Sequence, residues 1–560
     1  MDLPVRSLSA TRRAHHRIAL LLTVIAVYAI LTSTLFELSD FPFDSDEAVH
    51  ALDGLRIASD VYHGEGKALL EDIYFTHWYP PLLPTYLASF LLFLGPATWS
   101  ARYAVLLLSI IYLALMYQVA SALSRRSEAG LIALLLAATS SFVWMQSLMA
   151  MEEMLALIGV LLTILVYSRS EHGRGNPIWI GLCIAGTLLA RLSIGISVAA
   201  AVAVAVFFGP GRPRRKIMAA WRIFAPLALV CAAWWGHPQK VWDFLGYVQA
   251  SPPAYESLRW VEASFYWRAM VTTFTVSPLV GALVLASIVL AVFHWAETNW
   301  RLPLALVATT WVVLLIEKQL NVRFFAAAVS ASFLLAGNSF SRYLHILPAS
   351  TDGLRTSVIR AVLVLAVTGS SIAYLIARID AFPFLMEVAL ETDTAAAEMY
   401  SWITDTLTDD SPVFLINGWD QLSGIAYSFH EASTRWPRWR AARAIDVLLV
   451  DPQEHPEAVT SFQESVMELP RSYVVHLGNT PVPSAGAWWA YQAALQPCWG
   501  GDWESTRSFW IGLWDGGMKA EVISHPFRYV RPEDRLAARE SYRYPLSVEA
   551  KIAVCDELRR

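Results

Sequence analysis

Residues 101–123 read ARYAVLLLSIIYLALMYQVASAL and contain a single charged side chain, that of Arg102. About 20 consecutive apolar residues are needed to cross a membrane, because a bilayer core is roughly 30 Å thick and a helix rises about 1.5 Å per residue. This segment therefore predicts a membrane-spanning helix, and similar runs recur along the chain. The candidate spans are 18–36, 101–123, 129–147, 153–168, 177–190, 193–209, 218–235, 270–293, 302–316, 323–338 and 357–376.

The composition divides the chain into two parts. The 560 residues are 56% hydrophobic and only 16% charged, with a mean hydropathy of +0.44, whereas soluble domains carry about 25% charged residues. The apolar runs end near residue 380, and strand and helix signals then alternate. Strands are expected at 412–417, 447–451 and 473–477, with a helix from 418 to about 430. We therefore expect an all-α polytopic membrane domain at 1–380, with about eleven spans, and a small C-terminal α/β domain at 381–560.

Charge and cysteine content narrow the partners and the compartment. The net charge of −5 argues against a nucleic-acid partner, because such partners require a basic surface. Cys498 and Cys555 lie in the tail and can pair if the tail is in an oxidising compartment. The span at 18–36 is longer than the apolar core of a signal peptide and has no cleavage site after it, so we interpret it as a retained anchor.

The orientation follows from the positive-inside rule. The apolar stretch at 81–95 is short and contains Pro84, which suits a re-entrant or interfacial helix. If this stretch does not cross the membrane, all the main basic segments face the cytoplasm, namely the N-terminus, 125–126, 169–174, 212–216, 342 and 355–360. If it crosses, most of them face outward. The outer face is therefore expected to carry 37–100, 148–152, 191–192, 236–269, 317–322 and the tail.

The first outer loop holds a dense cluster of acids around Asp46 and Glu47. Adjacent carboxylates repel each other unless they share a cation or a proton, and oxygen-rich sites suit Mg²⁺ or Mn²⁺. A carboxylate in this place can also act as a general base toward a hydroxyl or an amine. The alternative is a helix N-terminus, with Ser45 or Asp46 as the capping residue and Glu47 in the first turn.

Further candidate metal ligands lie in other outer segments. Glu152 and Glu153 stand at the start of a span, and acids at a membrane edge usually face a cavity. Either one can complete a metal site with Asp46, or the two can simply mark where the span begins. His77, in the first outer loop, is a third candidate ligand.

Aromatic residues of the outer loops are candidates for substrate contact. Trp78 and Tyr79 can stack on a sugar, although an interfacial aromatic belt is the better interpretation. The loop at 236–269 contains Tyr255 and Trp260 and is long enough to form a lid. An amphipathic segment lying at the membrane interface is the alternative for this loop.

Cationic groups at two outer turns suggest a phosphate site. Arg191 interrupts an apolar run, and its guanidinium can grip a phosphate in a bidentate manner. The alternative is an arginine that snorkels at a loop. Arg323 and Lys318 supply further cations at the outer hairpin 317–325. Arginines at the outer ends of separate spans are suited to neutralising a lipid phosphate.

The order of these segments resembles the GT-C class of polyprenyl-phosphate-dependent glycosyltransferases, in the bacterial branch of aminoarabinose transferases and relatives of the protein mannosyltransferases. The likeness covers roughly 18–340. Residues 46–50 (DEAVH) are similar to the DE motif of this class, 77–82 to its Pro-Pro-Leu segment, 181–191 to its GLxxGxxxLxK pattern and 321–324 to its hairpin before a late span.

The resemblance implies roles for several residues. Asp46 would be the catalytic base, and Arg191 and Arg323 would lie at the lipid phosphate. A divalent metal ion would be shared between Asp46 and one of Glu47, Glu152 and Glu153. The sequence departs from the pattern at residue 152, where Asp is common, at Arg191, where Lys is usual, and at 78–79, where Trp and Tyr replace a charged pair.

We therefore predict a multi-pass protein of the cell membrane that acts as a hexosyl- or pentosyltransferase. It would move a sugar from a polyprenyl-phosphate carrier to a lipid, glycan or protein acceptor on the extracytoplasmic face, with Asp46 and Glu47 as catalytic residues and Mg²⁺ or Mn²⁺ as cofactor. The main alternative is a transporter or flippase of lipid-linked sugars that performs no chemistry. A second alternative is a catalytically inactive scaffold whose tail binds glycans.

Overall fold

The computed structural model of the chain describes residues 5–37, 45–75, 80–238, 240, 265–272, 274–317, 322–346, 369, 398–417, 423–436, 438, 444–447, 456–478, 485–500, 502–512 and 545–556. Within these ranges the side chains of a few residues near the gaps, including that of Asp46, are outside the description.

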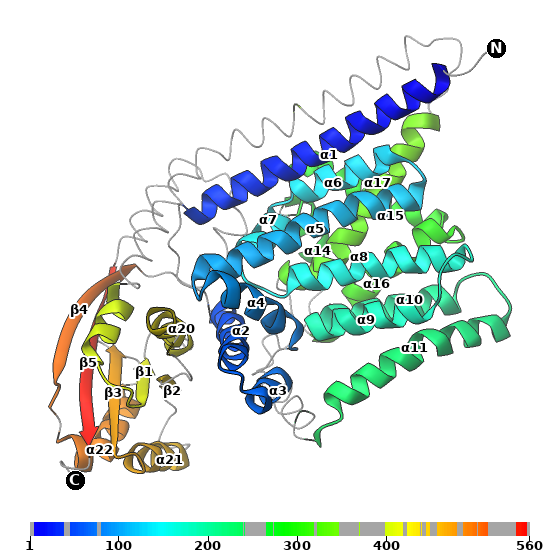
Figure 1. The fold of residues 1–560 in the computed structure, drawn as a ribbon. Helices are drawn as coiled ribbons and strands as arrows, with labels where there is room; N and C mark the ends of the chain where they lie inside the picture. Colours follow the sequence, from blue (N-terminus) through cyan, green and yellow to red (C-terminus); the bar gives the residue numbers. More distant parts are fainter. Residues whose placement is uncertain are drawn as a thin grey trace.

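The first two thirds of the chain form a helical bundle (Figure 1). The helices are α1 (Val5–Glu37), α2 (Ser45–His63), α3 (Gly66–Tyr74), α4 (Leu82–Leu94), α5 (Thr98–Ser124), α6 (Ser127–Ala138), α7 (Ser141–Leu148), α8 (Glu153–Glu171), α9 (Ile178–Ala190), α10 (Leu192–Phe207), α11 (Pro213–Trp235), α14 (Phe265–Thr272), α15 (Pro278–Phe293), α16 (Thr298–Glu317), the 3₁₀ turn η1 (Val322–Phe325) and α17 (Ala326–Ile346).

Apolar helices of spanning length identify the chain as a multi-pass membrane protein. Among the described residues, four helices are long and apolar enough to cross a membrane, and six if each of two bent pairs counts as one span. The four are Thr98–Ser124, Glu153–Glu171, Pro213–Trp235 and Arg323–Arg342. Six of the other predicted spans correspond to shorter or bent apolar helices, namely 18–36, 129–147, 177–190, 193–209, 270–293 and 302–316. The predicted span at 357–376 lies outside the described residues apart from Gly369.

Two predicted spans are broken in the structure for visible reasons. The segment 129–147 divides into α6 and α7 near Ser140, whose backbone is extended and whose hydroxyl donates to the carbonyl of Phe274 at 2.7 Å. The segment 270–293 divides before α15, where the Ser277 hydroxyl caps the helix by accepting from the Val280 amide and proline occupies the next position. Polar hydroxyls at these points offer the backbone partners other than the continuing helix.

The stretch predicted to be re-entrant or interfacial forms the short helix α4, which packs against α2. Its 13 residues span only about 20 Å, less than a bilayer core. The two helices approach closely at Gly54, where an added Cβ would lie 3.1 Å from the Leu87 Cβ and from the Pro84 carbonyl oxygen. α4 thus supports α2 from one side.

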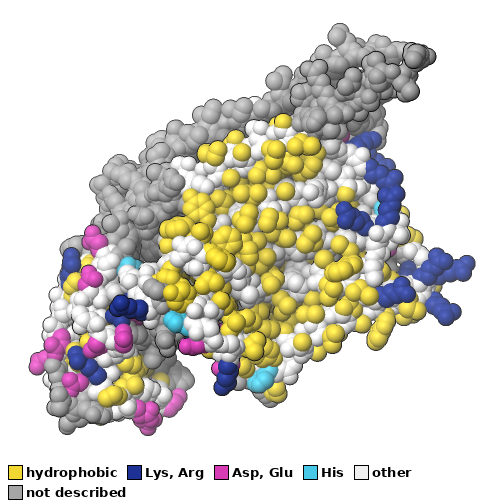
Figure 2. Space-filling view, in the orientation of Figure 1, with side chains coloured by type: hydrophobic (Ala, Val, Ile, Leu, Met, Phe, Trp, Pro, Cys, Tyr) yellow, Lys and Arg dark blue, Asp and Glu magenta, His cyan; other side chains and the backbone are white. Residues whose placement is uncertain are grey.

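Several basic residues lie at the end of the helices opposite the first residue of α8. Arg169 is in the last turn of α8, whereas Glu153 is its first residue. Arg125 follows α5 directly and Arg212 directly precedes α11. Figure 2 shows Lys and Arg side chains gathered at the end of the bundle away from the C-terminal sheet. This arrangement agrees with the positive-inside analysis, which expects residues 125, 169 and 212 on one face and residues 148–152 on the other.

The tail forms a five-stranded mixed sheet with the order β2-β1-β3-β5-β4 (Figure 1). β1 (Val413–Asn417) pairs in parallel with β2 (Ala444–Val447) and β3 (Arg471–Gly478), and the antiparallel β5 (Pro545–Asp556) joins β3 to β4 (Ser505–Gly512). Both faces of the sheet are packed: Leu415 and Val475 belong to one apolar core, and Phe414 and Val474 to the other.

Helices that accompany this sheet include α20 (Ser423–Arg435), α21 (Pro456–Met467) and α22 (Ala485–Trp499), and residues 398–406 are helical as well. A disulfide bond between Cys498 and Cys555 ties α22 to β5. The predicted strands at 412–417 and 473–477 are confirmed. The described part of the third strand, β2, lies a few residues earlier than the predicted 447–451, whose residues 448–451 lie outside the description.

Candidate functional site

The first turn of α2 delivers a buried carboxylate to the end of the bundle where α8 begins. Glu47 is 1% exposed, and both of its oxygens have partners. The backbone amide of Ala150 donates to Oε1 at 2.6 Å, and Nη2 of Arg102 lies 3.3 Å from Oε2. The helix-start interpretation of the acidic loop is therefore right about local structure, since α2 begins at Ser45. The Glu47 side chain, however, links α2 to the connection between α7 and α8.

The start of α8 supplies two further carboxylates, which converge on one arginine. Glu152 and Glu153 are 2% and 0% exposed. Nη1 of Arg191 donates to Oε1 of Glu152 at 2.9 Å and also donates to Oε1 of Glu153. Oε2 of Glu152 lies 2.5 Å from Nε2 of His50, which is on α2. Each acid thus has a cationic or imidazole partner, as burial of a carboxylate requires.

Arg191 reaches this position because the helix breaks at it. Its extended backbone, with φ −152° and ψ 119°, separates α9 from α10. The carbon centre of its guanidinium lies 4.8 Å from the ring centroid of Phe324, and that of Arg323 lies 5.5 Å from the same ring. The charge of Arg323 also acts on Glu153. The two arginines that were predicted to act together therefore both lie within cation–π distance of one aromatic ring.

The electrostatics of the cluster favour the ionised form of Glu152. Burial raises the pKa of Glu152, but the positive charge of Arg191 and the hydrogen bond from His50 outweigh it and hold this pKa well below its usual range. Among the described residues the cluster combines three carboxylates, Glu47, Glu152 and Glu153, with three guanidinium groups, Arg102, Arg191 and Arg323.

The structure brings together five of the residues predicted from the sequence: Glu47, Glu152, Glu153, Arg191 and Arg323. The Asp46 backbone lies in α2, one turn before His50, and its side chain is outside the description. Other predicted site residues lie outside the described residues altogether, namely His77, Trp78, Tyr79, Tyr255, Trp260 and Lys318.

Sequence reasoning missed His50 and Arg102 as members of the cluster. A signal for each was present. His50 lies four residues after Asp46, which is one helical turn, and Arg102 is the only charged residue of its predicted span, where a charge usually faces the bundle interior.

The described residues do not by themselves form a metal site. Within them, no group of three or more His, Cys, Asp or Glu side chains is arranged to hold a metal ion. His50 and Glu152 form a pair of donors, but Arg191 is bonded to the same carboxylate and would compete with a cation there. The metal ion predicted from the sequence therefore stays a prediction.

Comparison with known proteins gives the fold a context. No family model matches the sequence, and no curated protein sequence is significantly similar to it. The structure of ArnT from Cupriavidus metallidurans bound to undecaprenyl phosphate matches with a TM-score of 0.50 and 13% identity, over 82% of this chain and 93% of ArnT. Its apo state matches with a TM-score of 0.51 and 14% identity, over 84% of this chain and 93% of ArnT.

A second enzyme shows the same likeness. The Archaeoglobus fulgidus oligosaccharyltransferase, in a complex with Zn and sulfate, matches with a TM-score of 0.50 and 12% identity, over 81% of this chain and 68% of that one. All these matches cover more of the chain than its membrane part, so the likeness extends into the tail. The chain therefore has the fold of GT-C class membrane glycosyltransferases, as the resemblance in its sequence predicted.

Proposed function

We propose that this protein transfers a sugar from a polyprenyl-phosphate carrier to an acceptor on the extracytoplasmic face of the cell membrane. The observation that carries the proposal is the cluster of the buried Glu47, Glu152, Glu153 and Arg191 with the half-buried Arg323, at one end of a bundle with the ArnT fold. Buried charges at such a density cost stability, and their concentration at one end of the helices is typical of a functional site.

The donor class is supported by the guanidinium groups and by the ArnT likeness. ArnT was determined bound to undecaprenyl phosphate. In this chain Nε of Arg191 is buried and has no hydrogen-bond partner among the described residues, so it has a donor to offer a phosphate oxygen. Arg323, whose guanidinium carbon lies 5.5 Å from the Phe324 ring centroid, adds a second positive charge. Lys318 is proposed as a third cation.

The proposed reaction is a direct displacement at the anomeric carbon. The acceptor hydroxyl or amine transfers its proton to Asp46 as its heteroatom bonds to the anomeric carbon. The bond between that carbon and the phosphate oxygen breaks, and the polyprenyl phosphate leaves with its negative charge stabilised by Arg191 and Arg323. Because both oxygens of Glu47 are occupied by Ala150 and Arg102, we assign Glu47 a positioning role in place of the catalytic role first expected.

The side of the membrane is supported by two observations. Cys498 and Cys555 form a disulfide bond, and such bonds persist in oxidising compartments outside the cytoplasm. The basic helix ends lie opposite the acidic cluster, and basic segments are retained on the cytoplasmic side. We therefore place the cluster and the domain at 381–560 on the extracytoplasmic face.

The alternative is a transporter or flippase of lipid-linked sugars. Secondary transporters usually bind their substrate near the bilayer midplane, between discontinuous helices. Here the acids lie at the first residues of α2 and α8, at the end of the bundle. This position favours a reaction at the membrane surface over passage through the membrane.

The experiment uses the purified full chain, a radiolabelled polyprenyl-phosphate sugar and an envelope extract as the source of acceptor. The wild type is expected to move label from the lipid to a new product and to release polyprenyl phosphate. Asp46→Ala is expected to abolish both, since the base is removed. If Asp46→Ala works as fast as the wild type, the proposed mechanism is wrong; if label crosses the bilayer without any change of the lipid, the transporter alternative holds.

A further inference from the structure

Helix α20 of the tail has two faces with different partners. Tyr427, Glu431 and Arg435 follow one another at intervals of four residues and therefore lie on one face. Phe429, Ala432 and Trp436 have the spacing i, i+3 and i+7 and form a second, apolar stripe. The two stripes allow one helix to contact two parts of the protein at once.

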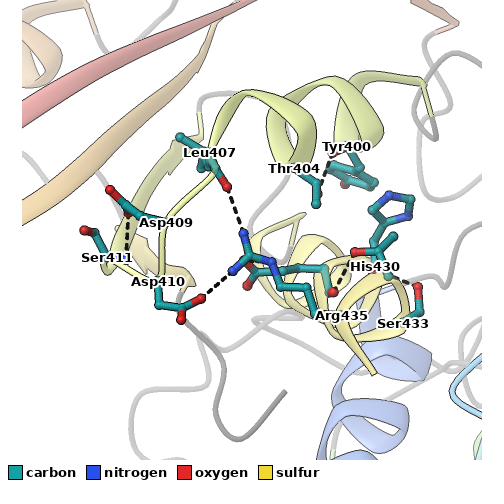
Figure 3. A network of polar contacts seen from close by, with 11 residues as sticks. Tyr400, Thr404, Leu407, Asp409, Asp410, Ser411, His430, Ser433 and Arg435 are labelled. Carbon is teal, nitrogen blue, oxygen red and sulfur yellow. Dashed lines mark hydrogen bonds and ion pairs between the residues drawn. The ribbon is translucent and has the colours of Figure 1, made fainter. Parts of the chain in front are cut away.

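The first face fixes α20 to the tail. Tyr427 is fully buried in the core on one side of the sheet. Arg435 donates to Oδ1 of Asp410 and to the carbonyl of Leu407, both at 2.8 Å, and its Nε lies 3.7 Å from the buried Glu431. Figure 3 shows Arg435 reaching from α20 to the loop that carries Asp410. α20 is therefore rigidly attached to the domain.

The second face packs against the membrane part. Phe429 and Ala432 are 3% and 0% exposed and belong to the same apolar core as the helices of the bundle, and Trp436 packs on that core. The partner element is α2, and the ring centroids of Trp436 and Tyr62, in the last turn of α2, are 5.4 Å apart.

We propose that α20 is the element through which the tail positions α2, with Trp436 and Tyr62 as positioning residues for the acids at the other end of that helix. The inference rests on the proposed function. Helix α2 runs without a break from Ser45 to His63, so its first and last turns move together. α4 holds its middle at Gly54, and α20 holds its end.

The consequence for the reaction follows from the geometry at the first turn of α2. Nε2 of His50 lies 2.5 Å from Oε2 of Glu152, and the Ala150 amide donates to Oε1 of Glu47 at 2.6 Å. A displacement of α2 by about 1 Å would break these contacts, and misplacement on this scale costs up to about 10²-fold in rate. Trp436→Ala is therefore expected to lower kcat about tenfold while leaving KM for the donor unchanged, because Arg191 and Arg323 are not on α2.

The control separates coupling from damage to the tail. Trp503 packs on Trp499 at 4.4 Å on the other side of the sheet, so Trp503→Ala perturbs the same domain without touching α20's contact with α2. The conservative Trp436→Phe, which keeps an aromatic ring, is expected to restore kcat. In a double-mutant cycle, Tyr62→Ala and Trp436→Ala together are expected to be no slower than the slower single variant.

Hydrogen–deuterium exchange of the full chain provides a measurement that does not depend on sugar transfer. Trp436→Ala is expected to accelerate amide exchange in α2, whereas Trp503→Ala leaves it as in the wild type. Unchanged exchange in α2, equal effects of the two variants, or independent effects of Tyr62→Ala and Trp436→Ala on kcat would each overturn the inference. A wild type that transfers no sugar contradicts the proposed function alone, since exchange still decides this proposal.

Discussion

Replacing Arg191 by methionine removes the positive charge that joins both acids of α8 to the rest of the cluster. Nη1 of Arg191 bonds to Glu152 at 2.9 Å and also to Glu153, and all three residues are at most 5% exposed. Breaking a buried ion pair costs about 3–5 kcal/mol, because a charge is left without compensation. Glu152 keeps His50 and Glu153 keeps the charge of Arg323, so the expected loss is near the lower limit, about 3 kcal/mol.

Activity is expected to fall further than stability explains. On the proposed mechanism Arg191 also stabilises the leaving phosphate, and loss of one such group typically costs about 10²–10³-fold in kcat. Thermal unfolding of the purified protein measures the first effect, and transfer per folded molecule measures the second. The double variant Arg191→Met/Glu153→Gln, which removes one of the acids left without its partner, is expected to recover stability but no activity. A single Arg191→Met variant with wild-type stability and rate would refute the reasoning.

Three other changes test separate parts of the structure. Glu47→Ala removes the hydrogen bond from the Ala150 amide and the ion pair with Arg102, and is expected to lower the free energy of unfolding by about 3 kcal/mol. Glu47→Gln keeps an acceptor for the amide, so its unfolding temperature should lie nearer to that of the wild type. Equal unfolding temperatures for all three proteins would contradict the positioning role. Burial and the charge and hydrogen bond of Asp72 raise the pKa of Asp60 from 3.8 to about 6, so the folded state holds this proton more tightly than the unfolded chain and loses stability as the pH rises through about 6. Asp60→Asn should therefore be the more stable protein at pH 8 by at most about 1 kcal/mol, with no advantage at pH 4, as thermal unfolding at the two pH values would show. The disulfide between Cys498 and Cys555 joins residues 57 apart in the sequence, and its removal by Cys498→Ser and Cys555→Ser is expected to lower the stability of the tail by about 4 kcal/mol. In wild-type protein that has not been reduced, these two cysteines should resist alkylation. Their labelling without a reductant would contradict the extracytoplasmic placement.

Much of the fold was predictable because its signals are local. Long apolar runs such as 101–123 predict helices irrespective of their neighbours, and Arg191 marks a break between two of them. The strands at 413–417 and 471–478 contain short apolar runs, and such runs predict buried strands. The breaks near Ser140 and Ser277 were harder to predict, since isolated hydroxyls are common inside spans that continue.

The antiparallel half of the sheet escaped prediction for a different reason. β5 alternates apolar residues with charged ones such as Glu549 and Lys551, and it pairs with β3 from a distance of about 70 residues along the chain. No local pattern specifies such a pairing. The α/β class was right, but the mixed character of the sheet had to come from the structure.

Sequence reasoning singled out five members of the charged cluster but none of the contacts between them. Sidedness placed the acids and arginines on one face, because that argument depends only on the order of spans and charges. The sequence did not indicate that Glu47 bonds to the Ala150 amide or that Glu152 lies against His50, since both contacts join segments about 100 residues apart. These contacts are the basis on which we propose a positioning role for Glu47.

The most direct test of the central claim measures the release of polyprenyl phosphate. The purified chain is given a polyprenyl-phosphate sugar and envelope extract, and the wild type is compared with Asp46→Ala and Arg191→Met. The account predicts that the wild type releases polyprenyl phosphate together with a glycosylated product and that neither variant does so above background. Wild-type protein that leaves the lipid-linked sugar intact, or variants that match its rate, would contradict the claim that this cluster is the site of sugar transfer.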